Sequence, residues 1–154
     1  STSVKKAVVI LEPTKGSKTS GYLYFTQLAS SVKVEAIVTG LEPGKKHGYH
    51  IHEFGDLSKK DGTSCGGHYN PKGHAHALPP EKDRHAGSFG NLQADHNGVA
   101  KAQFEDNTIS VGGHYHPILG RCLVVHAKED DGEQPTGNAG ARIAVGVIGV
   151  RFDN

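Results

Sequence analysis

Hydrophobic and polar residues alternate along most of this chain with a period of two. The alternation is clearest over 31–38, where the even positions from 32 to 38 hold Val or Ala while Lys33 and Glu35 take odd positions. Successive side chains of a strand point to opposite faces, so this pattern predicts a β-strand with one buried and one solvated face. Comparable segments bounded by Gly, Pro or Asn-Gly turn signals are 4–12, 21–28, 48–56, 99–104, 108–111, 122–126 and 142–152.

Helical periodicity is almost absent, and we expect at most one helical turn, near Glu81. Many short strands joined by turns predict one all-β domain over 1–154, a β-sandwich or barrel. Two long polar segments, 57–93 and 128–141, interrupt the strands. Loops of such length inside a compact domain are usually functional, and the histidines of the first loop favour that interpretation.

Charge and cysteine content narrow the classes of protein. The chain has 17 basic and 16 acidic residues in mixed order, so nothing indicates a nucleic-acid or membrane partner. No apolar run approaches the roughly 18 residues that span a bilayer. No secretory leader is evident, and the start at Ser1 is compatible with removal of a leading segment. The two cysteines, Cys65 and Cys122, allow one bridge or two thiols.

The histidines indicate metal chemistry. The chain holds 11 histidines and no Met or Trp. On a strand over 48–56, His50 and His52 would share one face and point at one spot. Such a pair alone is also found on solvated strand faces, but imidazole is a ligand for copper, zinc, iron or nickel, and further histidines follow.

The positions of the histidines in the predicted strands and loops divide them into two groups. His126 ends the segment 122–126 and His68 lies in the first long loop, so folding can bring them to His50 and His52 as a four-nitrogen site suited to copper. A second group within the loop, followed by Ser88, suits zinc and comprises His68, His74, His76 and His85. The others, read as surface or hydrogen-bonding residues, are His47, His96, His114 and His116.

Several motifs in order resemble the copper/zinc superoxide dismutase family nearly end to end. They are Gly-Tyr-His-Ile-His-Glu-Phe-Gly-Asp at 48–56, His-Tyr-Asn-Pro at 68–71, Arg-His-Ala-Gly at 84–87, Gly-Arg-Cys-Leu-Val-Val-His at 120–126 and Gly-Asn-Ala-Gly-Ala-Arg at 137–142. The resemblance implies an eight-stranded antiparallel Greek-key β-sandwich or barrel with two long functional loops, in agreement with the strand count.

The resemblance also implies an activity and roles for residues. The family converts superoxide to dioxygen and hydrogen peroxide with a redox-cycling copper, while a proton moves on and off the bridging histidine, here His68. The matching copper ligands are His50, His52, His68 and His126, and the matching zinc histidines are His68, His76 and His85. Arg142 would hold the anion, and Asp130 would join the two sites through His50 and His76. Members are commonly homodimers, and the matching surfaces are 54–56, 118–120 and 147–152.

Two departures from the family concern the zinc site and the disulfide. Ser88 stands at the position of the zinc aspartate, so we expect weak zinc binding, or a fourth ligand from water or His74. The loop cysteine, Cys65, lies three residues before His68 instead of six, and Val145 takes the matching position on the last strand. We predict a bridge from Cys65 to Cys122, with two free thiols as the alternative.

Two further departures concern the loops. Gly66 and Gly67 precede His68, so we expect a loosely held bridge if nothing pins this segment. The loop between His126 and Arg142 is shorter than the family usually has, with Pro135 in place of a charged stretch. Because charges there steer the anion inward, we expect slower but intact chemistry.

Superoxide dismutation is the favoured function, with superoxide as the small-molecule substrate. A copper-binding or chaperone-like domain is the alternative, since a binding module tolerates an altered zinc site. A structural sandwich has no reason to gather four imidazoles and an arginine. A bridged cysteine pair fits an extracellular, secreted protein, but this family also keeps its disulfide in the cytoplasm, so the sequence leaves the compartment open.

Overall fold

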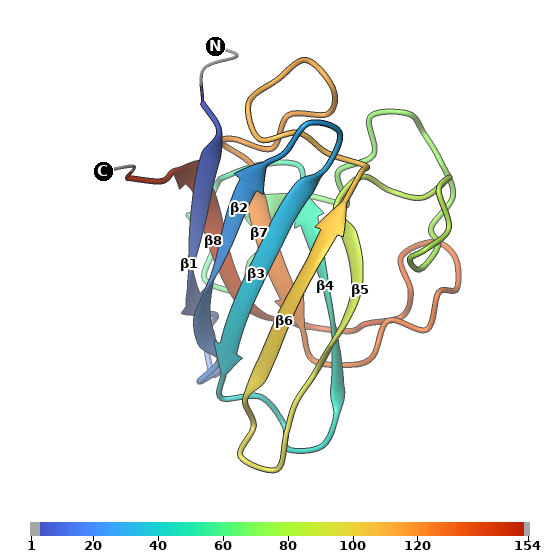
Figure 1. The fold of residues 1–154 in the computed structure, drawn as a ribbon. Helices are drawn as coiled ribbons and strands as arrows, with labels where there is room; N and C mark the ends of the chain where they lie inside the picture. The colour runs from blue at the N-terminus through green and yellow to red at the C-terminus, as the bar shows by residue number, and fades with distance from the viewer. Residues whose placement is uncertain (1–3, 153–154) are drawn as a thin grey trace.

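The computed structural model describes residues 4–152, and its long elements are all β-strands (Figure 1). The strands are β1 (Lys6–Pro13), β2 (Ser20–Gln27), β3 (Val32–Thr39), β4 (Lys46–His52), β5 (Ser88–Gln93), β6 (Ala100–Asp106), β7 (Cys122–His126) and β8 (Arg142–Val150). The described part of the chain has one 3₁₀ turn, η1 (Thr63–Cys65), and no α-helix. None of its helices could therefore cross a membrane. Residues 1–3 and 153–154, the ends of the domain expected over 1–154, lie outside the described residues.

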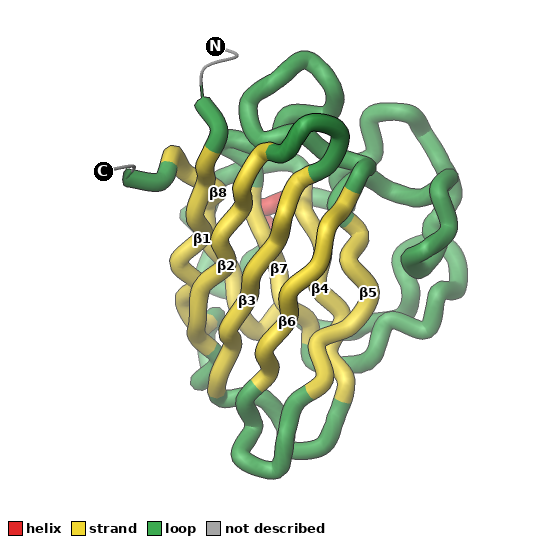
Figure 2. Tube along the Cα trace, viewed as in Figure 1, coloured by secondary structure: helices red, strands yellow, loops and turns green. Residues whose placement is uncertain are grey.

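The eight strands form one antiparallel sheet in the order β5-β4-β7-β8-β1-β2-β3-β6. The sheet curls into a nearly closed barrel, with the long loops gathered outside it (Figure 2). Strands distant in sequence pair with each other, as β1 does with β8, β3 with β6 and β4 with β7. This arrangement confirms the predicted all-β fold.

The alternating pattern over 31–38 follows the barrel wall. In the register of β2 against β3, Phe25 faces Val34 and Leu23 faces Ala36, and all four side chains are buried. Opposed side chains on one face of an antiparallel pair pack together, so this register builds the barrel core. Lys33 and Glu35 have intermediate burial on the other face.

The observed elements differ from the expectation at two strands and one turn. β5 lies within the expected loop 57–93, because its burial comes from pairing with β4 and from the core residues Phe89 and Leu92 rather than from β-branched content. The segment 108–111 is not a strand, because Thr108 bonds the Asp106 carboxylate through both its amide and its hydroxyl. The turn near Glu81 is not helical.

The two long loops meet beside the ends of β4 and β7. In Figure 1 the green segment after β4 and the orange segment after β7 both extend to the side of β5. Two hydrogen bonds join them: the His76 amide donates to Gln134 Oε1 (2.9 Å), and Gln134 Nε2 donates to the His76 carbonyl (2.6 Å). The two loops together therefore cover the outer side of the barrel beside β4 and β7, and this cover is called the loop roof below.

Candidate metal centre

Strand pairing brings the first histidines together. In β4, Tyr49 and Ile51 face the barrel core, while His50 and His52 point to the other side. β4 pairs with β7, and His126 ends β7. The His126 ring centroid lies 4.9 Å from that of His50 and 5.5 Å from that of His52. All three imidazoles are buried because the loop roof covers them.

His68 completes two adjoining groups. It forms an isolated β-bridge with His52, which places it over the β4 histidines. The nitrogens of His50, His52, His68 and His126 lie within 4.8 Å of one another, and so do those of His68, His76 and His85. His68 Nδ1 lies 2.9 Å from His85 Nδ1, so this nitrogen faces the second group and leaves Nε2 for the first. The four-histidine group fits a copper site.

Hydrogen bonds select which nitrogen of each ring can bind a metal. His52 and His126 use Nδ1–H to donate to the carbonyls of Gly66 (2.9 Å) and Gly140 (3.0 Å), which leaves both Nε2 atoms, 3.4 Å apart, as acceptors. His50 donates through Nε2 instead, so its Nδ1 remains. A fixed tautomer of this kind is how surrounding groups prepare an imidazole for a metal.

Asp130 links the two groups. Its fully buried carboxylate accepts from Nε2 of His50 at 2.6 Å and from Nε2 of His76 at 2.8 Å. Burial would raise the pKa of Asp130, but the hydrogen bonds from both imidazoles outweigh it and the pKa lies below its usual value. Nδ1 of His50 and Nδ1 of His76 remain buried without a hydrogen-bond partner. Such orphaned atoms are costly unless something else binds them, so the residues fit metals at both groups.

Lowered pKa values keep the buried imidazoles neutral, which is the state that binds a metal. Burial, followed by the neighbouring His50, lowers the pKa of His126 to about 4. Burial likewise holds the pKa values of His52 and His68 well below the ordinary range. Desolvation disfavours the charged imidazolium, so the lone pairs are available near neutral pH.

The zinc group has three imidazoles and a carboxylate behind them. His68, His76 and His85 with Asp130 fit a zinc site. His74 is outside the group, because its Nδ1 lies 3.3 Å from the Arg84 carbonyl. Ser88 is 1% exposed, and its Oγ has no hydrogen-bond partner.

Arg142 stands at the opening above the copper group. It begins β8 and pairs with His126, and its guanidinium donates through Nη1 to the Gly62 carbonyl and through Nη2 to the Gly66 carbonyl, both at 2.7 Å. A cavity of about 160 Å³ is lined by His52, Gly67, His68, His126, Thr136, Ala139, Gly140 and Arg142. Among these, Arg142 is the one permanent charge. A guanidinium held in this way can receive a small anion beside the histidines.

The glycines before His68 do not leave it loose. Glu53 donates its amide to the Gly67 carbonyl and Tyr69 donates to the Ile51 carbonyl, both at 2.9 Å, so His68 is pinned on both sides. At Gly66, which has φ +77°, an added Cβ would lie 2.7 Å from the Phe54 ring. Only glycine fits there, and the condition under which a loosely held His68 was expected is not met, because backbone hydrogen bonds fix the segment.

The two cysteines lie together in a small apolar cluster. Cys65 and Cys122 are fully buried beside Val124 and Val145, as unbonded thiols. A hydrogen bond between the thiols lowers the pKa of Cys65, while that bond and burial raise the pKa of Cys122. Val145 packs against Gly62, where a Cβ would lie 3.0 Å from Val145 Cγ1. Cys65 thus lies on the same loop as the family's first cysteine position, whereas Cys122 lies on β7, the strand beside the β8 position that Val145 occupies.

The burial of one histidine was not foreseen, although its hydrogen-bonding role was among the expectations. His47, expected at the surface or in a hydrogen bond, is 2% exposed, and its Nδ1–H donates to the His126 carbonyl at 3.0 Å. It therefore supports the backbone of a copper-group histidine from β4. Residues three apart on a regular strand face opposite sides, so the spacing of His47 from His50 does not reveal this contact. Of the other three, His96 and His114 are exposed and His116 bonds the Thr108 carbonyl.

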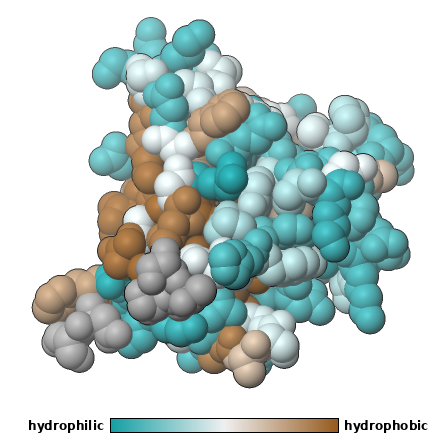
Figure 3. Space-filling model, turned by 90° about the horizontal axis from the view of Figure 1, so that it is seen from above, coloured by the Kyte–Doolittle hydropathy of each residue, from teal (hydrophilic) through white to brown (hydrophobic). Residues whose placement is uncertain are grey.

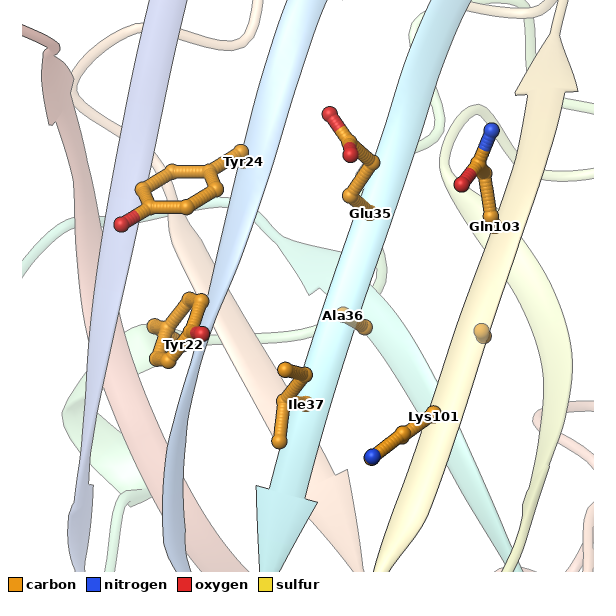
Figure 4. A pocket seen from close by; sticks show the side chains of 8 residues that line it. Tyr22, Tyr24, Glu35, Ala36, Ile37, Lys101 and Gln103 are labelled. Atoms are coloured by element: carbon orange, nitrogen blue, oxygen red, sulfur yellow. The ribbon is translucent and has the colours of Figure 1, made fainter.

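A second hollow lies away from the histidines. A groove of about 390 Å³ runs over the outer side of β2, β3 and β6 (Figure 4). It is lined by Tyr22, Tyr24, Glu35, Ala36, Ile37, Lys101, Ala102 and Gln103. The metal-ligating groups of the described residues contain none of these side chains. The groove is therefore separate from the metal centre.

Comparisons with known proteins agree with this geometry. Residues 19–148 match the profile of the family described as copper/zinc superoxide dismutase (SODC). A superoxide dismutase [Cu-Zn] of Paramecium bursaria Chlorella virus 1 is 44% identical over 96% of this chain and 80% of its own length. One from Cryptococcus neoformans is 44% identical over 94% of this chain and 97% of its own length. A copper chaperone for superoxide dismutase from Rattus norvegicus is 44% identical over 92% of this chain but 52% of its own length.

Proposed function

Because the chain belongs to the copper/zinc superoxide dismutase family, we propose that it dismutates superoxide to dioxygen and hydrogen peroxide. The observation that carries the proposal is the four-histidine group with Arg142 beside it at one small cavity. Copper, when bound, supplies a one-electron couple that takes an electron from one superoxide and gives it, with two protons, to the next.

The side chains of the site have separate roles in binding copper, transferring a proton and orienting the ligands. His50, His52 and His126 hold the copper, and their neutral state is maintained by burial. His68 lies between the two groups, so its Nε2 can hold and release a proton while Nδ1 remains on the zinc side. Asp130 keeps His50 and His76 in the tautomer that exposes Nδ1. The loop roof excludes bulk water from the buried imidazoles.

Arg142 binds and orients the anion. Two carbonyl hydrogen bonds fix its guanidinium against the cavity, so substrate meets a preset cation. The loop over 127–141 has exposed acids at Glu129, Asp131 and Glu133 and an exposed cation at Lys128. Arg142 therefore carries most of the local attraction for superoxide, and the shortened loop adds little steering.

The rat copper chaperone relative supports a second candidate, a copper-handling domain with little activity. One preparation, reconstituted with copper and zinc and assayed for metal content and superoxide consumption, separates the candidates. We expect one copper and one zinc per chain with dismutase activity. Full copper content without activity would refute the enzyme and leave the copper-handling function.

An apolar patch supports assembly into a homodimer. Figure 3 shows apolar side chains gathered on one side of the molecule, away from the polar loops. Exposed residues on β1, β8 and the segment after β4 include Ile10 (61%), Phe54 (56%) and Val147 (39%). A patch of this kind on a chain of a family that commonly dimerises fits a second copy of the same chain, joined by a two-fold interface.

Introducing a charge into this patch should separate the subunits. Val147→Glu places a carboxylate among the apolar side chains, and burying it unpaired at an interface is costly. We expect sedimentation of the parent protein at twice the 16.3 kDa chain mass and of the variant at a single chain mass. Glu35→Gln on the opposite sheet segment is the control. A parent protein that sediments as a monomer would contradict the proposal.

The cysteine pair lies where a disulfide would stabilise the segment that holds Arg142 and His52. We propose that Cys65 and Cys122, which are neighbouring free thiols in this structure, form a disulfide on oxidation that ties the segment 62–66 to β7. This segment supplies both carbonyls that hold Arg142, and its Gly66 carbonyl also accepts from His52. The bridge would therefore restrain the anion-binding arginine and a copper ligand together.

A further inference from the structure

The zinc group offers three nitrogens and no fourth protein ligand. This inference rests on the proposed function, because it concerns the zinc site of the same centre. Among the described His, Cys, Asp and Glu residues, this group has no member besides His68, His76 and His85, and Asp130 is close instead to His50 and His76. Zinc in proteins takes four ligands, and three imidazoles with one open position are the arrangement of catalytic zinc sites.

Ser88 follows His85 of the zinc group by three residues and is joined to it by a backbone hydrogen bond. It is the Cα partner of His50 in the β4–β5 ladder. Directly opposed residues of an antiparallel pair place their side chains on the same face, so the Ser88 hydroxyl lies on the face of the His50 imidazole. The side chain is 1% exposed, and Oγ has no hydrogen-bond partner. A buried unpaired hydroxyl is unfavourable, which indicates that a further group meets it.

The backbone around Ser88 is fixed without any metal. The Ser88 amide donates to the His85 carbonyl (3.2 Å), and Arg84 Nε donates to the Ser88 carbonyl (3.0 Å). Arg84 is anchored in turn by Asp106 Oδ2 at 2.6 Å. The Gly87 amide donates to Thr108 Oγ1 at 3.0 Å. The turn from His85 to Ser88 therefore presents the hydroxyl in one preset position.

Other protein groups are already engaged. The two Asp130 oxygens accept from His50 and His76, and Oδ1 also accepts from the Gly132 amide at 2.9 Å. The His74 ring lies against the Arg84 carbonyl. A serine hydroxyl is neutral, and carboxylate, imidazole and thiolate are the usual protein ligands of zinc. These groups leave the fourth position to a molecule from solvent.

We infer that the fourth ligand of a zinc held by His68, His76 and His85 is an exchangeable water or small inorganic anion, hydrogen-bonded to Ser88 Oγ. No carboxylate of the group neutralises the ion directly, so its charge favours an anionic ligand. The buried surroundings restrict the position to water, hydroxide or an anion of a few atoms. The site thus binds small anions at zinc, separately from the anion position at Arg142.

Cobalt(II) in the zinc site tests this inference. The copper site is filled with Cu(I), which has no d–d absorption in the visible range, and azide is added while the cobalt bands are recorded. We expect a saturable shift of the bands in the parent protein. Ser88→Asp should abolish the shift, because a carboxylate occupies the position, and Ser88→Ala should retain it with roughly 2- to 10-fold weaker azide binding.

Ser110→Ala is the matched control, because Ser110 is another buried serine whose Oγ lacks a partner and it lies outside the metal groups. Its cobalt spectrum and azide response should equal those of the parent. If azide shifted the cobalt bands in neither the parent protein nor Ser88→Asp, the inference would be overturned, since a protein group would then occupy the fourth ligand position. Failure to bind cobalt would overturn it as well. Superoxide consumption is measured separately, so loss of activity with the azide shift intact would refute only the proposed function.

Discussion

Arg142→Ala should lower kcat/KM for superoxide roughly 10- to 100-fold while the protein retains its copper, since electrostatic steering of this kind is worth about 10- to 1,000-fold. The side chain is the one permanent charge lining the cavity at the copper group. It does not belong to the histidine groups that hold metal, so its removal should leave copper binding intact. Activity and copper content of the same samples are the measurement.

Two variants make this result specific. Arg142→Lys keeps the charge but loses the planar fork that bonds Gly62 and Gly66, so intermediate activity is expected. Lys60→Ala removes an exposed cation from the same loop and should leave activity unchanged. If Arg142→Ala retained full activity at full copper content, the arginine would have no role in anion capture.

The second large effect is on stability. The oxidised parent protein should be about 4 kcal/mol more stable than the double variant Cys65→Ala/Cys122→Ala, because a bridge across a loop of this length restricts the unfolded chain. Denaturant unfolding gives the two free energies, and mass spectrometry without reductant identifies the bridged peptide. The bridge should form readily, since both sulfurs lie in one buried cluster.

The single variants distinguish a bridge from two packed thiols. With a bridge, either single substitution removes the whole constraint, and the second adds only its own packing loss. With two thiols, the losses are more nearly additive, and treatment with a reductant changes nothing. A reductant-insensitive parent protein would show that Cys65 and Cys122 remain thiols.

Local pattern was enough for most of the barrel but not for all of its strands. The alternation over 31–38 predicts β3 because one face of that strand meets the core and the other meets solvent. β5 has no such signal, since its sequence Ser-Phe-Gly-Asn-Leu-Gln is made a strand by pairing with β4. The segment 108–111 has a strand-like sequence but forms no strand, because Thr108 donates two hydrogen bonds to the Asp106 carboxylate and the chain bends there.

The histidine groups were foreseeable to different degrees. The spacing of His50 and His52 indicates a shared face by itself, because the period of a strand is two. The closeness of His68, His74, His76 and His85 in one loop indicated a second group, and the motif resemblance selected three of the four, without His74. That resemblance predicted a weakened zinc site, whereas the three imidazoles with Asp130 behind them fit zinc.

The sequence by itself determined the all-β class, the residue types for two metals and the family to which the chain belongs, because these depend on periodicity and on motifs close in sequence. Only the tertiary structure decided that backbone pairing pins His68 and that Ser88 Oγ is buried without a partner, and it places Cys65 beside Cys122 as predicted. Each of these depends on contacts between segments far apart in sequence, which are set by strand register and loop packing rather than by any local pattern.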